Sequence, residues 1–350
     1  MKRILYVFVF TILAYSTYAQ CTLNDTHAIE TVNDAYFPDS NSPIYIVRLN
    51  LHIMGNNGIG NFQNTVTDIA YIEQLFDDAN AVLANNQAPI WNGPQSDPYL
   101  PDAKIRYRID GIYFHHDSIF AHSKPYGTRD VYFNQYGVNI NHSINIFFVE
   151  LLNDDGTPHP HIAGEGFGLN GEDKNCVGLY SYYYNWLNNP WARSICATHI
   201  VHELGHALGL LHTHQPDELS DTYLPDVGGQ CNYNTDLNCS NNIMGVASSK
   251  GHLSPRQMGK MRRLMTVGWR SKVVDNCLHN ESMVSVTDDQ TWNLPRLFSS
   301  DVTISNGATV TLSCKAYLPQ QKKIIVEANS KLIIEGNGSI IYATNRLVFW

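Results

Sequence analysis

Three histidines lie in a pattern that suits metal-assisted hydrolysis. The stretch 202–212 reads HELGHALGLLH, which has the form HExxHxxGxxH. His202 and His206 are four residues apart, so on a helix both imidazoles project from one face and can bind one metal ion. Gly209 can adopt a positive φ, which would end the helix and bring His212 round as a third ligand. Three nitrogen ligands leave the fourth position of a tetrahedral zinc ion open, as in catalytic zinc sites.

A glutamate adjoins the first of these ligands. Glu203 is placed to reach a water molecule on the zinc without joining the ligand set, so we predict that it is the catalytic general base. The alternative is that these histidines only decorate a helix surface. The pattern fixes five residues, and its chance occurrence in a chain of this length is on the order of one in ten thousand, which disfavours that alternative.

A second motif follows downstream. The stretch Asn242-Ile243-Met244-Gly245 places a methionine 32 residues after His212. A methionine in a turn is usually core filler, but its order and distance here predict a tight turn whose Met244 packs beneath the zinc ligands.

With both motifs in this order the chain resembles the metzincin metallopeptidases, and within them it is most similar to the pappalysin (cytophagalysin-like) family. The resemblance covers roughly residues 43–270. It implies an α/β (α+β) catalytic domain with a twisted five-stranded mixed sheet and a zinc cleft, and it implies hydrolysis of peptide bonds. The residues that match beyond the zinc motif are Thr213, Leu253, Ser254, Gln257 and Met261.

The chain departs from this family at one position. Members usually have Tyr two residues after the turn methionine, where it helps to polarise the scissile carbonyl, and this chain has Val246. The main functional hypothesis is a zinc endopeptidase with Glu203 as general base. The alternative is a surface or adhesion protein with a degenerate protease domain, since Val246 leaves room for it.

The substrate is expected to be an extended protein or peptide. The segment 162–168 precedes the short strand that leads to the zinc helix, where metzincins place their edge strand. We predict that this segment forms the upper rim of the cleft and pairs with substrate as an added strand. The predicted substrate-binding residues are Ala163, Gly164, Glu165 and Gly166.

The elements that must position these residues can be predicted from hydrophobic periodicity. Strands are expected at 44–49, 103–114, 144–152 and 177–183, and helices at 67–84, 193–208 and 254–265. Ser254 and Pro255 have the residue types of a helix cap and first turn. This order favours an α/β sheet.

The composition changes near residue 285 to short β runs with Gly/Asn turns, which predicts an all-β accessory module, the first rungs of a β-solenoid. The expected division is a signal peptide at 1–19, an N-terminal segment at 20–42, the peptidase domain at 43–280 and the β module at 285–350. The chain ends on an apolar run, so we expect the natural protein to continue.

The N-terminus has the features of a secretory signal peptide, namely Lys2 and Arg3, an apolar run too short to span a bilayer, and small residues before Gln20. We therefore expect an exported protein with no transmembrane segment. The net charge is −9 with no basic run, which argues against a nucleic-acid partner. Export makes disulfides plausible among the seven cysteines, and an odd count leaves at least one thiol unpaired within the chain.

The sequence also offers candidate ligands for a calcium ion. The irregular stretch after the zinc motif contains carboxylates that could supply oxygen ligands for structural Ca²⁺, although no EF-hand spacing is present. These carboxylates are Asp217, Asp221 and Asp226. His199 lies three residues before His202, and its alternatives are a role beside the zinc ligands or a packed polar residue.

Overall fold

The protein is described by a computed structural model. It describes residues 36–39, 42–55, 62–90, 99–117, 129–150, 163–166, 176–180, 190–213, 217, 219–222, 240–245, 251–267, 273–274, 283–293, 295–298, 300–319, 322–336 and 338–343.

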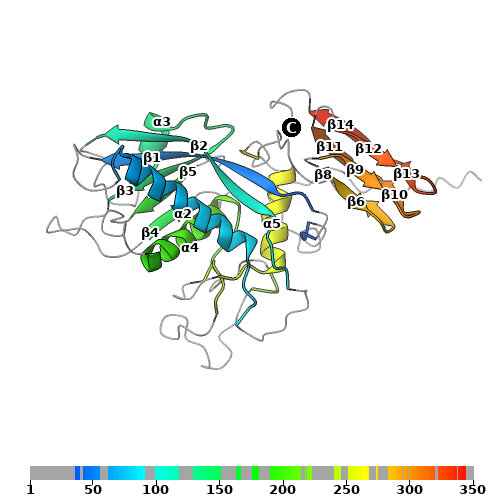
Figure 1. Ribbon diagram of the computed structural model, residues 1–350, viewed down its shortest axis with the longest axis horizontal. Coiled ribbons are helices and arrows are strands. Elements are labelled where there is room, and N and C mark those ends of the chain that lie inside the picture. Colours follow the sequence, from blue (N-terminus) through cyan, green and yellow to red (C-terminus); the bar gives the residue numbers. More distant parts are fainter. Residues whose placement is uncertain are drawn as a thin grey trace, which may run out of the picture.

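A five-stranded sheet forms the centre of the larger part of the molecule (Figure 1). Its spatial order is β2-β1-β3-β5-β4, with four parallel strands and β4 antiparallel at one edge. Two of its inner strands, β1 and β3, are almost fully buried, and β1 carries polar side chains at alternate positions, namely Arg48, Asn50 and His52. The strands are β1 (Tyr45–Gly55), β2 (Ile105–His116), β3 (Ile144–Val149), β4 (Ala163–Gly166) and β5 (Cys176–Tyr180).

Two long helices, α2 (Val66–Ala84) and α4 (Pro190–Ala207), lie side by side against this sheet (Figure 1). Helix α2 begins after Thr65, whose side chain accepts a hydrogen bond from the backbone N–H of Asp68. Its buried apolar residues recur at helical spacing and join the core under the sheet; they are Tyr71, Ile72, Leu75, Phe76, Ala79 and Leu83.

Two shorter helices complete this part. Helix α3 (Arg129–Tyr136) contacts β5, and α5 (Pro255–Val267) lies between the sheet and the C-terminal strands (Figure 1). Helix α5 is anchored near the start of β1, where the Tyr45 hydroxyl lies 3.0 Å from Thr266 Oγ1. Its methionines join the main core: Met258, Met261 and Met265.

The C-terminal part is a parallel β-solenoid. Nine strands form three parallel three-stranded sheets, and each turn of the chain gives one strand to each sheet. The strands are β6 (Val284–Val286), β7 (Gln290–Trp292), β8 (Arg296–Leu297), β9 (Val302–Ile304), β10 (Thr309–Leu312), β11 (Lys315–Pro319), β12 (Ile324–Val326), β13 (Lys331–Ile334) and β14 (Ser339–Ala343).

This solenoid has its own core, in which Trp292 and the β9–β11 residues are buried. Its turns use left-handed backbone at Asn306 and, one coil later, at Asn329, which are the residue types that tolerate a positive φ. The two cores meet where Tyr317 packs against the main core and the Tyr36 hydroxyl donates to the Pro295 carbonyl at 2.8 Å.

The mixed α/β architecture predicted from the sequence is confirmed, and the short β runs after residue 285 are the solenoid strands. In the described residues, no helix is long and apolar enough to cross a membrane. The predicted signal peptide at 1–19 lies outside the described residues.

Candidate metal centre

Helix α4 ends in a turn whose backbone conformation is allowed because residue 209 is a glycine. Gly209 has φ +96°, the left-handed region that favours glycine. Its N–H donates to the His206 carbonyl and the N–H of Leu210 donates to the Gly205 carbonyl, both at 2.9 Å. This pair of hydrogen bonds is the Schellman arrangement, which satisfies the last carbonyls of the helix. The chain then reverses and carries His212 back toward the helix.

The three histidines meet at one point. The Nε2 atoms of His202 and His206 are 3.2 Å apart, those of His202 and His212 are 3.2 Å apart, and those of His206 and His212 are 3.0 Å apart. Three nitrogens bound to one tetrahedral zinc ion at about 2.0–2.1 Å would lie about 3.3 Å from one another. Among the described residues, this is the group of histidine, cysteine or acidic side chains arranged to hold a metal ion.

Backbone carbonyls fix the tautomers of two of these rings. His202 Nδ1 lies 2.6 Å from the Ile243 carbonyl oxygen, and His206 Nδ1 lies 2.8 Å from the Leu210 carbonyl oxygen. A carbonyl only accepts, so each Nδ1 carries a proton. In the neutral ring each Nε2 then presents a lone pair. Lone pairs facing one another at this distance repel unless a cation lies between them, so the donor set fits a metal ion.

The glutamate borders this centre without being part of it. Glu203 is buried, and its Oε1 lies 4.0 Å from His202 Nε2 and 3.5 Å from His199 Nε2. The rings of His199 and His202 are nearly parallel, with centroids 6.0 Å apart. The Glu203 carboxylate is therefore close enough to receive a proton from a molecule at the metal centre, and His199 lies beside it.

The methionine turn lies directly beneath the zinc-motif helix. Met244 is fully buried, and its Sδ lies 2.7 Å from the point where a side chain at Gly205 would place its Cβ. A glycine at 205 therefore allows the sulfur to touch the helix backbone. The same turn supplies the Ile243 carbonyl that orients His202, so it positions a predicted ligand as well as filling space.

Polar side chains hold this turn to α5. The backbone N–H of Met244 donates to Asn242 Oδ1 at 2.9 Å, and Asn242 Nδ2 donates to Gln257 Oε1 at 2.9 Å. Gln257 Oε1 also accepts from the N–H of Ser254, whose hydroxyl accepts from the N–H of Gln257. This is a capping box, so one glutamine side chain caps the helix and holds the turn.

Two of the three carboxylates that could bind calcium, Asp217 and Asp221, make hydrogen bonds within the protein. Asp221 accepts from the Ser254 hydroxyl at 2.9 Å and from the N–H of Arg256 at 3.0 Å, at the N-terminus of α5. Asp217 accepts from the N–H of Leu219 and from the Thr222 hydroxyl. Burial raises the pKa of Asp217. The geometry gives the calcium hypothesis no support at these two residues, and Asp226 lies outside the described residues.

The predicted rim is a real edge strand. Residues Ala163–Gly166 form β4, which pairs antiparallel with β5 and contacts α4, the helix of the zinc motif. Its other edge has no strand partner among the described residues. Pairing of this edge with a substrate strand stays a prediction. Val246 lies outside the described residues.

Cys196 on α4 is a free thiol buried in the core. Cross-links among the remaining cysteines stay a prediction; Cys21, Cys231, Cys239 and Cys277 lie outside the described residues.

Several residues that shape this site carry no signal in a motif search. The carbonyls of Ile243 and Leu210 act through the backbone, and any residue type can supply them. The capping box of Ser254 and Gln257 could have been found from its spacing, because serine followed three residues later by glutamine is a helix-start pattern. The cap by Asp221 joins residues 33 positions apart and leaves no local pattern.

Comparison with known proteins adds little to this geometry. No protein-family model matches the chain, and no curated protein matches its sequence. The crystal structure of metalloproteinase-II from Bacteroides fragilis is similar, with a TM-score of 0.32 and 13% sequence identity. The match covers 63% of this chain and 53% of that chain, so this chain spans about half the length of that protein.

Proposed function

We propose that this protein is a zinc-dependent endopeptidase. The observation that supports this most strongly is the convergence of three imidazole Nε2 atoms within 3.0–3.2 Å, beside a buried glutamate. His202, His206 and His212 would hold the ion. Zinc at such a centre supplies Lewis acidity and lowers the pKa of water to about 7.

The chain's own residues would do the rest of the chemistry. Glu203 accepts the proton of the attacking water and later delivers it to the leaving amine, which is the usual work of a general base and acid. The carbonyls of Ile243 and Leu210 keep two imidazoles in the tautomer that offers Nε2 to a metal. With Val246 in place of Tyr, no hydroxyl is offered at that position to the scissile carbonyl.

The substrate would be an extended peptide. In this proposal the free edge of β4 takes a substrate strand through backbone hydrogen bonds, which select extended chains and impose little side-chain choice. Residues Ala163, Gly164, Glu165 and Gly166 are the proposed partners of that strand.

We also propose that the protein is exported, with residues 1–19 removed as a signal peptide. N-terminal sequencing of protein recovered from the culture medium should then begin at Gln20. Recovery of an intact Met1 in the medium would contradict this cleavage.

The activity can be tested with a peptide library and metal analysis. Purified protein should hold one zinc per chain, cleave peptides internally, and lose both zinc and cleavage when treated with a chelator. Re-addition of zinc should restore cleavage. Protein that binds one zinc yet cleaves no peptide would favour the alternative of a degenerate domain with a surface-binding role. Cleavage that continues in the presence of a chelator would contradict the zinc mechanism.

A further inference from the structure

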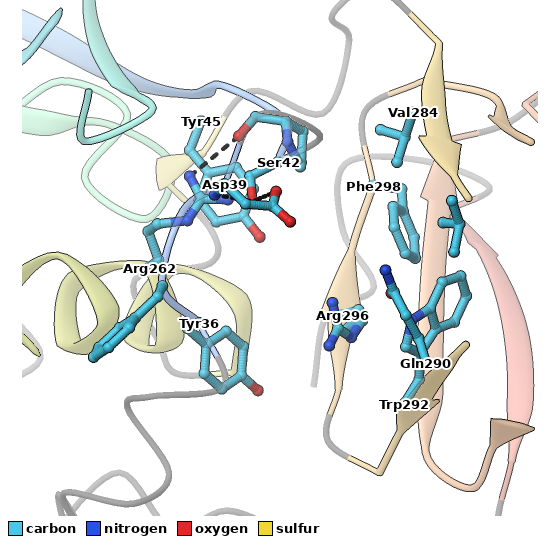
Figure 2. Close-up of a pocket in the computed structure, with 13 residues that line it drawn as sticks. Tyr36, Asp39, Ser42, Tyr45, Arg262, Val284, Gln290, Trp292, Arg296 and Phe298 are labelled. Atoms are coloured by element: carbon cyan, nitrogen blue, oxygen red, sulfur yellow. Dashed lines mark hydrogen bonds between the residues drawn. The ribbon is translucent and has the colours of Figure 1, made fainter. Parts of the chain in front are cut away.

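A cavity of about 310 Å³ lies where the segment before β1 meets the first turn of the β-solenoid (Figure 2). Tyr36 and Tyr45 lie on one side, and Trp292 and Phe298 lie on the other (Figure 2). Arg296 on β8 projects into the space between them (Figure 2). The lining includes no residue of the metal centre or of β4, so this is a separate site.

Arg296 is the feature of this cavity that the fold does not explain. Its Cζ lies 5.6 Å from the centre of the Trp292 ring, and within the described part of the chain its guanidinium makes no hydrogen bond or ion pair. Burial lowers the pKa of Arg296, while the neighbouring Tyr36 and Asp39 raise it. A guanidinium remains charged in proteins, so this half-buried one, which has no acceptor among the described residues, can take an anion in the cavity as its partner.

Two other charged side chains of the lining, Arg262 and Asp39, already make hydrogen bonds within the protein. Arg262 donates to the carbonyls of Pro43 and Lys104 and stacks on the Tyr45 ring at 4.1 Å. The carboxylate of Asp39 accepts from the Ser42 hydroxyl at 2.7 Å.

Gln290 adds a second donor. Its Oε1 accepts from Trp292 Nε1 at 2.9 Å, and its amide N–H groups have no acceptor among the described residues. Arg296 and Gln290, both half-buried, therefore both offer N–H groups to a ligand in the cavity. A carboxylate accepts hydrogen bonds from such groups, so this side of the cavity suits an anion with an apolar body.

We infer that this cavity binds the C-terminal carboxylate of a peptide that ends in an aromatic residue. A planar guanidinium matches a carboxylate with two parallel hydrogen bonds. Rings on both sides suit a flat aromatic group. The cavity volume lies at the lower end of small-molecule sites, about 300–1,000 Å³, which suits one terminal residue. This inference does not depend on the proposed peptidase activity.

The direct test is calorimetric titration of the full chain with N-acetylphenylalanine and with its amide. The acid should bind at least ~10-fold more tightly than the amide, because the amide removes the charge that Arg296 would pair with. Glucuronate and inorganic phosphate should bind more weakly than the acid. Equal affinity for acid and amide, or tighter binding of glucuronate or phosphate, would overturn the assignment.

Two controls separate this site from the metal centre. Binding of the acid should persist after chelation, because a carboxylate held by zinc would be lost with the metal; loss on chelation counts against the cavity. Arg296→Met should weaken binding at least ~10-fold and Arg296→Lys should weaken it less, while Arg108→Met on β2 should change nothing. The acid–amide comparison uses unaltered protein, so it decides the question even if Arg296→Met fails to fold.

Discussion

Single atoms decide what this site can do. The two Nδ1 protons point at backbone carbonyls, and this leaves Nε2 lone pairs directed at a shared point. Glu203 is buried, and its Oε1 lies 4.0 Å from His202 Nε2. The sequence pattern predicted which residues meet, since the spacing of a helix and a glycine turn determines it. It could not predict the tautomers, because their partners are main-chain oxygens, which any residue type supplies, and one of them lies 41 residues away in sequence.

Glu203→Gln should separate metal binding from proton transfer. The amide has the same shape as the carboxylate and cannot accept the proton, so turnover should fall by about 10²- to 10⁴-fold while zinc content stays at one per chain. Peptide hydrolysis and metal analysis on the same sample check this. The control is Glu73→Gln, an exposed glutamate on α2, which should leave both unchanged. Normal turnover in Glu203→Gln would remove Glu203 from the mechanism.

His52 is a buried histidine outside the metal centre, and its protonation affects the stability of the fold. His52 is stacked on Phe147 at 4.5 Å, its Nε2 lies 2.9 Å from Asn145 Oδ1, and its Nδ1 lies 2.9 Å from His115 Nε2. The amide oxygen accepts, so Nε2 carries the proton and Nδ1 accepts from His115. Burial lowers the pKa of His52 from 6.5 to about 4. The fold therefore keeps this ring neutral.

Acid should weaken the fold through His52. Its pKa in the unfolded chain is near 6.5, so between pH 6.5 and 4 the unfolded state binds a proton that the folded state does not, and stability falls as pH falls. The full contribution, about 3 kcal/mol at most, is present above pH 6.5 and lost by about pH 4. Urea unfolding at pH 7, 5.5 and 4 measures it. His52→Phe should flatten the slope, and an unchanged slope would contradict the assignment.

At the scale of elements, the helix end and the methionine turn act together. Gly209 lets α4 stop, the next residues supply the Leu210 carbonyl, and the turn at Asn242 supplies the Ile243 carbonyl. The sequence predicted α4 at 193–208, and the structure has Pro190–Ala207. It predicted a helix start at Thr67, whereas Thr65 is the cap. Periodicity locates the apolar stripe well but says less about the first turn, where the stripe is absent.

Gly209→Ala should disturb both the fold and the metal centre. A Cβ there meets a strained φ of +96° and lies 2.3 Å from Leu264 Cδ1. The matched control is Gly307→Ala in a solenoid turn, where φ is +78° but the nearest atom is 4.0 Å away. We expect a loss of about 1 kcal/mol in the free energy of unfolding for Gly307→Ala from strain alone, and more for Gly209→Ala.

Zinc affinity distinguishes the two roles of this glycine. It should weaken in Gly209→Ala, because the Leu210 carbonyl that orients His206 would shift, and remain unchanged in Gly307→Ala. Competition with a chromogenic chelator measures it. Equal zinc affinity in both variants would show that the helix end does not position His206.

At the scale of the whole molecule, the strongest sequence signal after the zinc motif was the change of pattern near residue 285. The repeated short β runs and their Gly/Asn turns predicted a solenoid, and in the second and third coils these turns are left-handed at Asn306 and Asn329. The contact between the two cores could not be predicted. It depends on Tyr36, which lies before the first strand, and on Tyr317, whose position in the repeat gives no sign that it faces another core.

We propose that residues 43–280 and 285–350 are separate domains, and a chain that stops near Asn280 tests this. It should keep its zinc and cleave short peptides at a comparable rate, because the described metal ligands and β4 all precede residue 213.

The shortened chain should also have a lower melting temperature than the full chain. The cut removes the acceptor of the Tyr36 hydroxyl and uncovers core that Tyr317 packs against, a cost of about 1–2 kcal/mol. In the full chain, Tyr36→Phe should reproduce only the hydrogen-bond part of that loss. If the shortened protein stays folded and zinc-loaded but no longer hydrolyses peptides, the solenoid helps to build the active site and the two-domain division is wrong.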